Sequence, residues 1–144
     1  MKIQSKLSCK LTRNDELFVS AIENNHLQLA EFNHLAHVKL AYCYLAKADL
    51  ENSIKKMTQT LKSYLLANGV DGNKFHVTLT HAWIRAVWYF MRKGEVTQSA
   101  DEFVQTYPAL LNKDILLSHY SHTLLFSEQA RGKFVYPDIS PIPE

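Results

Sequence analysis

The stretch that decides the fold reads FNHLAHVKLAYCYL and covers residues 32–45. Its apolar side chains recur around most of a helical circumference, and Lys39 is its only charged residue. A helix that is apolar on nearly every side belongs in a protein interior. We therefore expect a central helix that begins near residue 30 or 33 and ends near residue 48.

The segments on both sides of this stretch also have helical patterns. Apolar residues recur at spacings of three and four over 50–67, and aromatic residues crowd 75–92. Further helices are expected at about 14–25, with Asn14 as the cap, from 99, over 115–125 and over 127–133. The chain has only four glycines and four prolines, which disfavours turn-rich β folds. The sequence thus predicts an all-α, single-domain bundle of five to seven helices spanning residues 1–144.

The two ends of the chain are expected to be non-helical. Residues 1–13 have the pattern of a loose or extended arm. Residues 135–144 contain three prolines and enough apolar side chains to pack as a tail on the surface. No apolar signal region or membrane-spanning run is evident, and the two cysteines form no disulfide framework, so we expect a cytoplasmic protein without membrane contact. A net charge of +2, with dispersed lysines and arginines, argues against a nucleic-acid partner, and no pattern indicates an oligomeric state.

Histidines on apolar helix stripes are the sharpest functional signal. His34 and His37 share a stripe with core residues of the central helix, and His76 opens the stripe of the helix over 75–92. Imidazole is a common ligand of iron and zinc, and two ligands three residues apart on a helix can reach one ion. Glu23 is the best-placed carboxylate, with Glu31 in reserve. These residues together predict a divalent metal site.

A second interpretation of the same histidines remains open. A buried neutral histidine can be satisfied by a backbone carbonyl or a tyrosine hydroxyl without any metal. The chain then has a structural cluster of buried histidines. It would be a non-catalytic helical module that senses a ligand or contacts another protein.

The chain also resembles an uncharacterised family of small bacterial all-helical proteins, from about residue 18 to 143. The resemblance rests on an FxHxxH motif, an aromatic-HxTxT motif, a Tyr-Ser pair and an ARxxFVxPD segment. These motifs correspond here to Phe32, His34 and His37, then Phe75, His76, Thr78 and Thr80, then Tyr120 and Ser121, and then Ala130, Arg131, Phe134, Val135, Pro137 and Asp138. The family pattern also includes the glutamate at position 23. The resemblance therefore singles out the same four residues as the helix stripes.

The leading hypothesis is a small metal-dependent enzyme acting on a small molecule. His34, His37 and His76 would hold iron or zinc, with Glu23 as fourth ligand or general base. Thr78 and Thr80 would position substrate or water, and Tyr44, Trp83 and Tyr120 would wall the pocket. An open coordination position would activate water or dioxygen, so hydrolytic and oxygenase chemistry both stay open.

Overall fold

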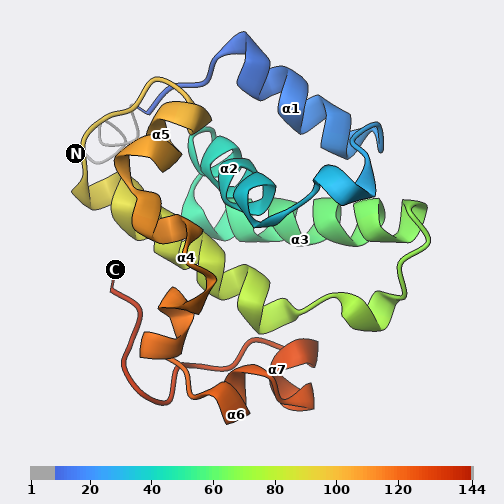
Figure 1. The fold of residues 1–144 in the computed structure, drawn as a ribbon, viewed down its shortest axis with the longest axis vertical. Coiled ribbons are helices and arrows are strands. Elements are labelled where there is room, and N and C mark those ends of the chain that lie inside the picture. The colour runs from blue at the N-terminus through green and yellow to red at the C-terminus, as the bar shows by residue number, and fades with distance from the viewer. Residues whose placement is uncertain (1–8, 144) are drawn as a thin grey trace.

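The computed structural model describes residues 9–143, which form helices joined by short loops, with no strand in that range (Figure 1). The α-helices are α1 (Arg13–Glu23), α2 (His34–Leu45), α3 (Leu50–Ala67), α4 (Val77–Lys93), α5 (Ala100–Thr106), α6 (His122–Leu125) and α7 (Glu128–Gly132). Short 3-10 helices are η2 (Leu29–Glu31), η3 (Gly72–Lys74), η4 (Pro108–Leu111) and η5 (Lys113–Ser118). The all-α prediction is confirmed. In the part of the chain described, no helix has both the length and the apolarity to cross a membrane.

The central position expected for the helix over residues 34–45 is found. Figure 1 shows α2 in the middle of the fold, and it contacts α1, α3, α4 and α5. Val38, Leu40 and Tyr42 are each 0% exposed. The side chain of Asn33 caps the helix, because its carbonyl oxygen accepts a hydrogen bond from the Ala36 amide at 2.9 Å. The apolar circumference of the sequence thus corresponds to contacts with four other α-helices, and Leu35, which is 40% exposed, is an exception in the first turn.

The start of α1 differs from the prediction, since its cap is Thr12 rather than Asn14. The Thr12 hydroxyl accepts from the Asp15 amide at 3.1 Å, and the Asp15 carboxylate accepts from the Thr12 amide at 3.0 Å. This reciprocal pair is a capping box. The same carboxylate oxygen accepts from the Ala100 amide, at the first residue of α5, at 3.1 Å. One buried side chain therefore joins the starts of two helices.

The expected N-terminal arm falls partly outside the described residues, which begin at Cys9. The Lys10 amide donates to the Thr97 carbonyl at 2.8 Å, and the Tyr42 hydroxyl donates to the Lys10 carbonyl at 2.8 Å. Cys9 is buried, and Arg13 already belongs to α1. The part of the arm that is described is thus attached to the core.

The C-terminal part has more and shorter helices than the sequence predicted. Instead of one helix over 115–125, the chain forms η5 and α6 with a break at Tyr120. The buried Tyr120 hydroxyl donates to the Val135 carbonyl at 2.6 Å, and Ser121 caps α6. The His119 carbonyl accepts from the amides of Ile139 and Ser140. The amides of Ile139 and Ser140 replace the intrahelical donor that the His119 carbonyl would have in a continuous helix. With the 3-10 helices counted, the described residues form more helices than the expected five to seven.

Candidate functional site

His76 uses both ring nitrogens to hold the fold together. It is the cap of α4, where Nδ1 accepts from the Leu79 amide at 3.0 Å. A neutral ring then carries its hydrogen on Nε2, which donates to the Leu125 carbonyl at 2.7 Å. Burial lowers the pKa of this histidine, which favours the neutral ring. A metal ion could bind His76 only by replacing one of these two hydrogen bonds.

His34 also has a structural partner. Its Nε2 donates to the Leu110 carbonyl at 2.9 Å, and its ring packs edge-on against Trp83 with 4.5 Å between centroids. Burial lowers the pKa of His34, and the nearby Lys113 acts in the same direction. This histidine joins α2 to η4 and α4.

His37 is the exception among the three. Its Nε2 is buried and has no hydrogen-bond partner among the described residues. Its ring stacks on Phe32 with 6.3 Å between centroids. Burial lowers the pKa of His37 to about 4, and His34 contributes in the same direction. A neutral buried imidazole with one unpaired nitrogen costs stability rather than adding to it.

The predicted metal ligands are not assembled into one site. Over residues 9–143, no group of three or more histidine, cysteine, aspartate and glutamate side chains is placed to hold a metal ion. Glu23 lies at the end of α1 with Tyr44 and Lys56 as its partners, and the reserve candidate Glu31 lies exposed in η2. The metal hypothesis therefore gains no support from this geometry.

The two candidate threonines are buried side chains of α4. The Thr78 hydroxyl donates to the Lys133 carbonyl at 2.9 Å and accepts from the Val135 amide at 3.1 Å. It thereby ties the segment after α7 to α4. Thr80 is 5% exposed on the same helix. The known partners of Thr78 are backbone groups, which indicates a structural role for it.

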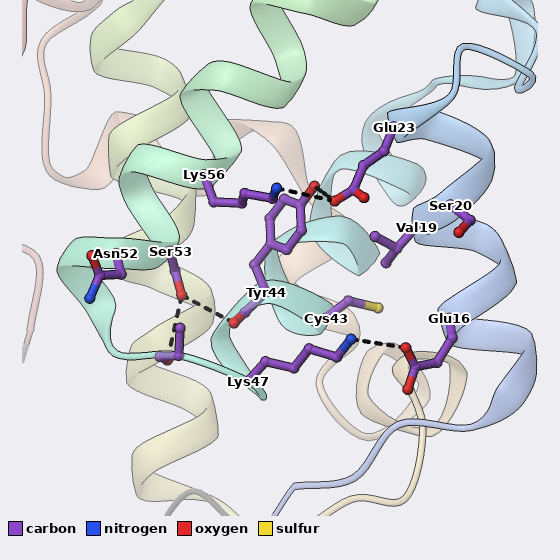
Figure 2. Close-up of a pocket in the computed structure, with 11 residues that line it drawn as sticks. Glu16, Val19, Ser20, Glu23, Cys43, Tyr44, Lys47, Asn52, Ser53 and Lys56 are labelled. Atoms are coloured by element: carbon purple, nitrogen blue, oxygen red, sulfur yellow. Dashed lines mark hydrogen bonds and ion pairs between the residues drawn. The ribbon is translucent and has the colours of Figure 1, made fainter.

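Glu23 instead belongs to a cleft between α1, α2 and the start of α3 (Figure 2). The cleft has a volume of about 510 Å³. Its lining residues are Glu16, Val19, Ser20, Glu23, Cys43, Tyr44, Lys47, Ala48, Asn52, Ser53 and Lys56. None of these described lining residues is a histidine. The cleft is within the size range of small-molecule sites.

A hydrogen-bonded chain fixes the carboxylate of Glu23. The Tyr44 hydroxyl donates to Glu23 Oε2 at 2.6 Å, and the Thr60 hydroxyl lies 2.8 Å from the same tyrosine oxygen. Because the tyrosine hydrogen is directed to the carboxylate, Thr60 is the donor in the second bond. Tyr44 is only 7% exposed, and burial, together with the Glu23 bond, raises its pKa. The cleft thus contains a carboxylate that the buried Tyr44 hydroxyl holds in place.

Two ion pairs cross the cleft. Lys47 Nζ lies 2.9 Å from Glu16, and Lys56 Nζ lies 3.8 Å from Glu23 Oε2. Figure 2 shows the Lys47 side chain, from the turn after α2, and the Lys56 side chain, from α3, reaching toward the carboxylates of α1. Between the pairs lie Val19 and the thiol of Cys43. Burial raises the pKa of that thiol to about 12, so it is protonated at neutral pH.

Sequence reasoning found part of this cleft and missed the rest. The sequence predicts functional roles for Glu23 and Tyr44, but it places Tyr44 in one pocket with Trp83 and Tyr120, which do not line this cleft. Glu16, Lys47 and Lys56 were not candidates. One signal was present: Glu16 and Glu23 are seven positions apart, which places them on one face of a helix.

Comparisons with protein-family models, with curated proteins and with solved structures found no match to this chain.

Proposed function

We propose that the protein binds a small polar molecule in the cleft between α1, α2 and α3, as a ligand-sensing module of the cytoplasm. The observation that carries this proposal is the fixed carboxylate of Glu23 inside a cleft of about 510 Å³. Ligand sites combine an apolar lining with a few polar groups in set positions. In this cleft the apolar lining comes from Val19, Cys43 and Ala48, and the polar group in a set position is the carboxylate of Glu23.

Binding is favoured over catalysis by the state of the side chains in the cleft. The Cys43 thiol has a pKa of about 12, and the Tyr44 hydroxyl is already engaged with Glu23 and Thr60. Neither group is ready to act as a nucleophile or to exchange protons near neutral pH. The metal-dependent enzyme would need His34, His37 and His76 at the same place as Glu23, and the two with hydrogen bonds are committed to backbone carbonyls.

The family resemblance supports the same cleft without identifying its ligand. The glutamate at position 23 is part of the pattern, and it is the residue at the centre of the polar network described above. We propose that the chain belongs to that family and that the histidines of the pattern stabilise the core rather than hold a metal.

A titration of the ¹⁵N-labelled protein with pooled small polar metabolites tests the proposal. We expect saturable shifts at amides of residues 16–23 and 43–56. Ser20→Trp places a large side chain at the cleft and should weaken binding at least tenfold, whereas Asn14→Trp, on another face of α1, should leave it unchanged. Shifts confined to other elements, or equal binding by both variants, would contradict the proposal.

A further inference from the structure

We propose that the ligand of this cleft is a zwitterion of the α-amino acid type, with its ammonium group at Glu23 and its carboxylate at Lys56. The inference rests on the proposed function, because it names the chemical class of molecule that the same cleft takes. It follows from three features of the cleft: the order of its charged side chains, the carboxylate oxygen of Glu23 that takes part in neither of the contacts with Tyr44 and Lys56, and the apolar lining between the ion pairs.

The charges of the cleft are segregated by element. Both carboxylates, Glu16 and Glu23, lie on α1, about 10.5 Å apart along the helix axis. The two ammonium groups come from the opposite side, with Lys47 just after α2 and Lys56 on α3. One wall is therefore negative and the other positive. A molecule lying across the cleft meets opposite charges at its two ends.

This order of charges selects against ions of one sign. An anion placed on Lys56 would also lie near Glu23, because the two side chains are 3.8 Å apart, and the carboxylates would repel each other. A cation placed on Glu23 would meet the same difficulty with Lys56. A molecule that carries both charges satisfies both residues, since each of its charged groups faces the opposite sign.

The existing ion pairs are weak enough to be exchanged for ligand contacts. The Lys56 and Glu23 side chains are 54% and 34% exposed, and their 3.8 Å separation is too long for a hydrogen bond. Lys47 and Glu16 are each 55% exposed. Exposed pairs of this kind contribute little to stability, because solvent screens them. A ligand that separates the charges therefore loses little by doing so.

Glu23 is the better anchor of the two carboxylates. Its contacts with Tyr44 and Lys56 both use Oε2, so Oε1 takes part in neither. Tyr44 holds the carboxylate in one position, which reduces the entropy lost when a ligand binds. Figure 2 shows Glu23, Lys56 and the Tyr44 hydroxyl converging at one end of the cleft. In the proposed complex, the ammonium group of the ligand lies at this end of the cleft, against Oε1 of Glu23.

The lining beyond this end suits the side chain of an amino acid. Val19 and Cys43 lie between the two ion pairs, and Glu16 and Lys47 lie beyond them (Figure 2). An aliphatic stem fits against the apolar part, and a polar end group would reach the second ion pair. A volume of about 510 Å³ also leaves room for a dipeptide, which carries the same two terminal charges.

The test uses matched probes and isothermal titration calorimetry of the full chain. The first set is the twenty common L-α-amino acids. The amino acid that binds most tightly is then compared with its decarboxylated amine and its deaminated carboxylic acid, which have the same side chain. We expect the zwitterion to bind at least tenfold more tightly than either analogue. If the amine or the acid binds equally well, the inference is overturned.

A third set separates failure of this inference from failure of the proposed function. It contains neutral polar and singly charged metabolites. If one of them binds in the cleft and no amino acid does, the ligand class is wrong and the proposed function stands. If no probe from any set binds in the cleft, both are wrong.

Charge-removing variants supply a readout that a purely structural role would not change. Glu23→Gln keeps an acceptor for Tyr44 and should weaken zwitterion binding roughly tenfold, while improving the acid relative to the amine. Lys56→Gln should also weaken it, while improving the amine relative to the acid. Lys55→Gln and Glu95→Gln change exposed residues outside the cleft and should leave all affinities unchanged. Unchanged selectivity in both cleft variants would overturn the assignment of charges.

Discussion

Replacing His76 by alanine should destabilise the fold strongly and independently of any metal. The substitution removes two hydrogen bonds made by one ring: Nδ1 with the Leu79 amide and Nε2 with the Leu125 carbonyl. Loss of a helix cap costs about 1 kcal/mol. Leaving a buried carbonyl without its donor costs about 1–3 kcal/mol. The free energy of unfolding should therefore fall by about 2–4 kcal/mol.

Urea denaturation measures this loss. With a slope of about 2 kcal/mol per molar urea, the middle of the usual range for small proteins, the midpoint should fall by about 1–2 M. His76→Asn restores a capping side chain but cannot reach Leu125, so it should recover about 1 kcal/mol. Each protein is measured with and without a chelator. A chelator that lowers the stability of the wild type to that of His76→Ala would refute the structural role and revive the metal hypothesis. A loss below about 1 kcal/mol would refute the hydrogen-bond argument.

Three further outcomes follow from buried polar groups. The folded pKa of His37, about 4, lies below its unfolded value of 6.5, so stability is complete above about pH 6.5 and is lost as the pH falls toward 4. Between pH 7.5 and 5, the wild type should lose about 2 kcal/mol of unfolding free energy through this ring, and His37→Leu should abolish that part of the loss in urea denaturation. An unchanged pH dependence in the variant would show that this ring is not the cause. Thr78→Val should cost about 2–3 kcal/mol and speed amide hydrogen exchange at Val135, whereas Thr78→Ser should do neither. Tyr44→Phe should leave Glu23 unanchored and weaken ligand binding in calorimetry by roughly tenfold, and unchanged affinity would count against the anchoring role.

The fold class followed from the sequence because side-chain periodicity reports burial. The pattern over residues 32–45 required an interior helix, and α2 is that helix. The break between η5 and α6 could not be predicted in the same way. It depends on where the Tyr120 hydroxyl and the His119 carbonyl find partners, and both partners lie in the C-terminal segment.

The candidate site, too, could be predicted from the sequence only in part. The histidine pattern predicted core-facing rings, and His76 is buried while His34 and His37 are partly buried, but the pattern could not tell which atoms the rings meet. His34 and His76 bond to carbonyls of Leu110 and Leu125, which are 76 and 49 residues away in the chain. A backbone carbonyl has no sequence signature, so the metal and structural interpretations could not be separated. Lys56 looked like part of a solvated helix face, and only the approach of α1 to α3 makes it part of a cleft.

The Asp15 carboxylate, which accepts hydrogen bonds at the starts of both α1 and α5, links the cleft to a distant part of the chain. The α1 wall contains Glu16 and Glu23, and Asp15 joins its first turn to Ala100, 85 residues away. A movement of α1 that admits a ligand must either carry α5 with it or break this hydrogen bond. Occupancy of the cleft would then be transmitted mechanically, and the solvent exchange rate of the Ala100 amide would report it at a position that no ligand touches.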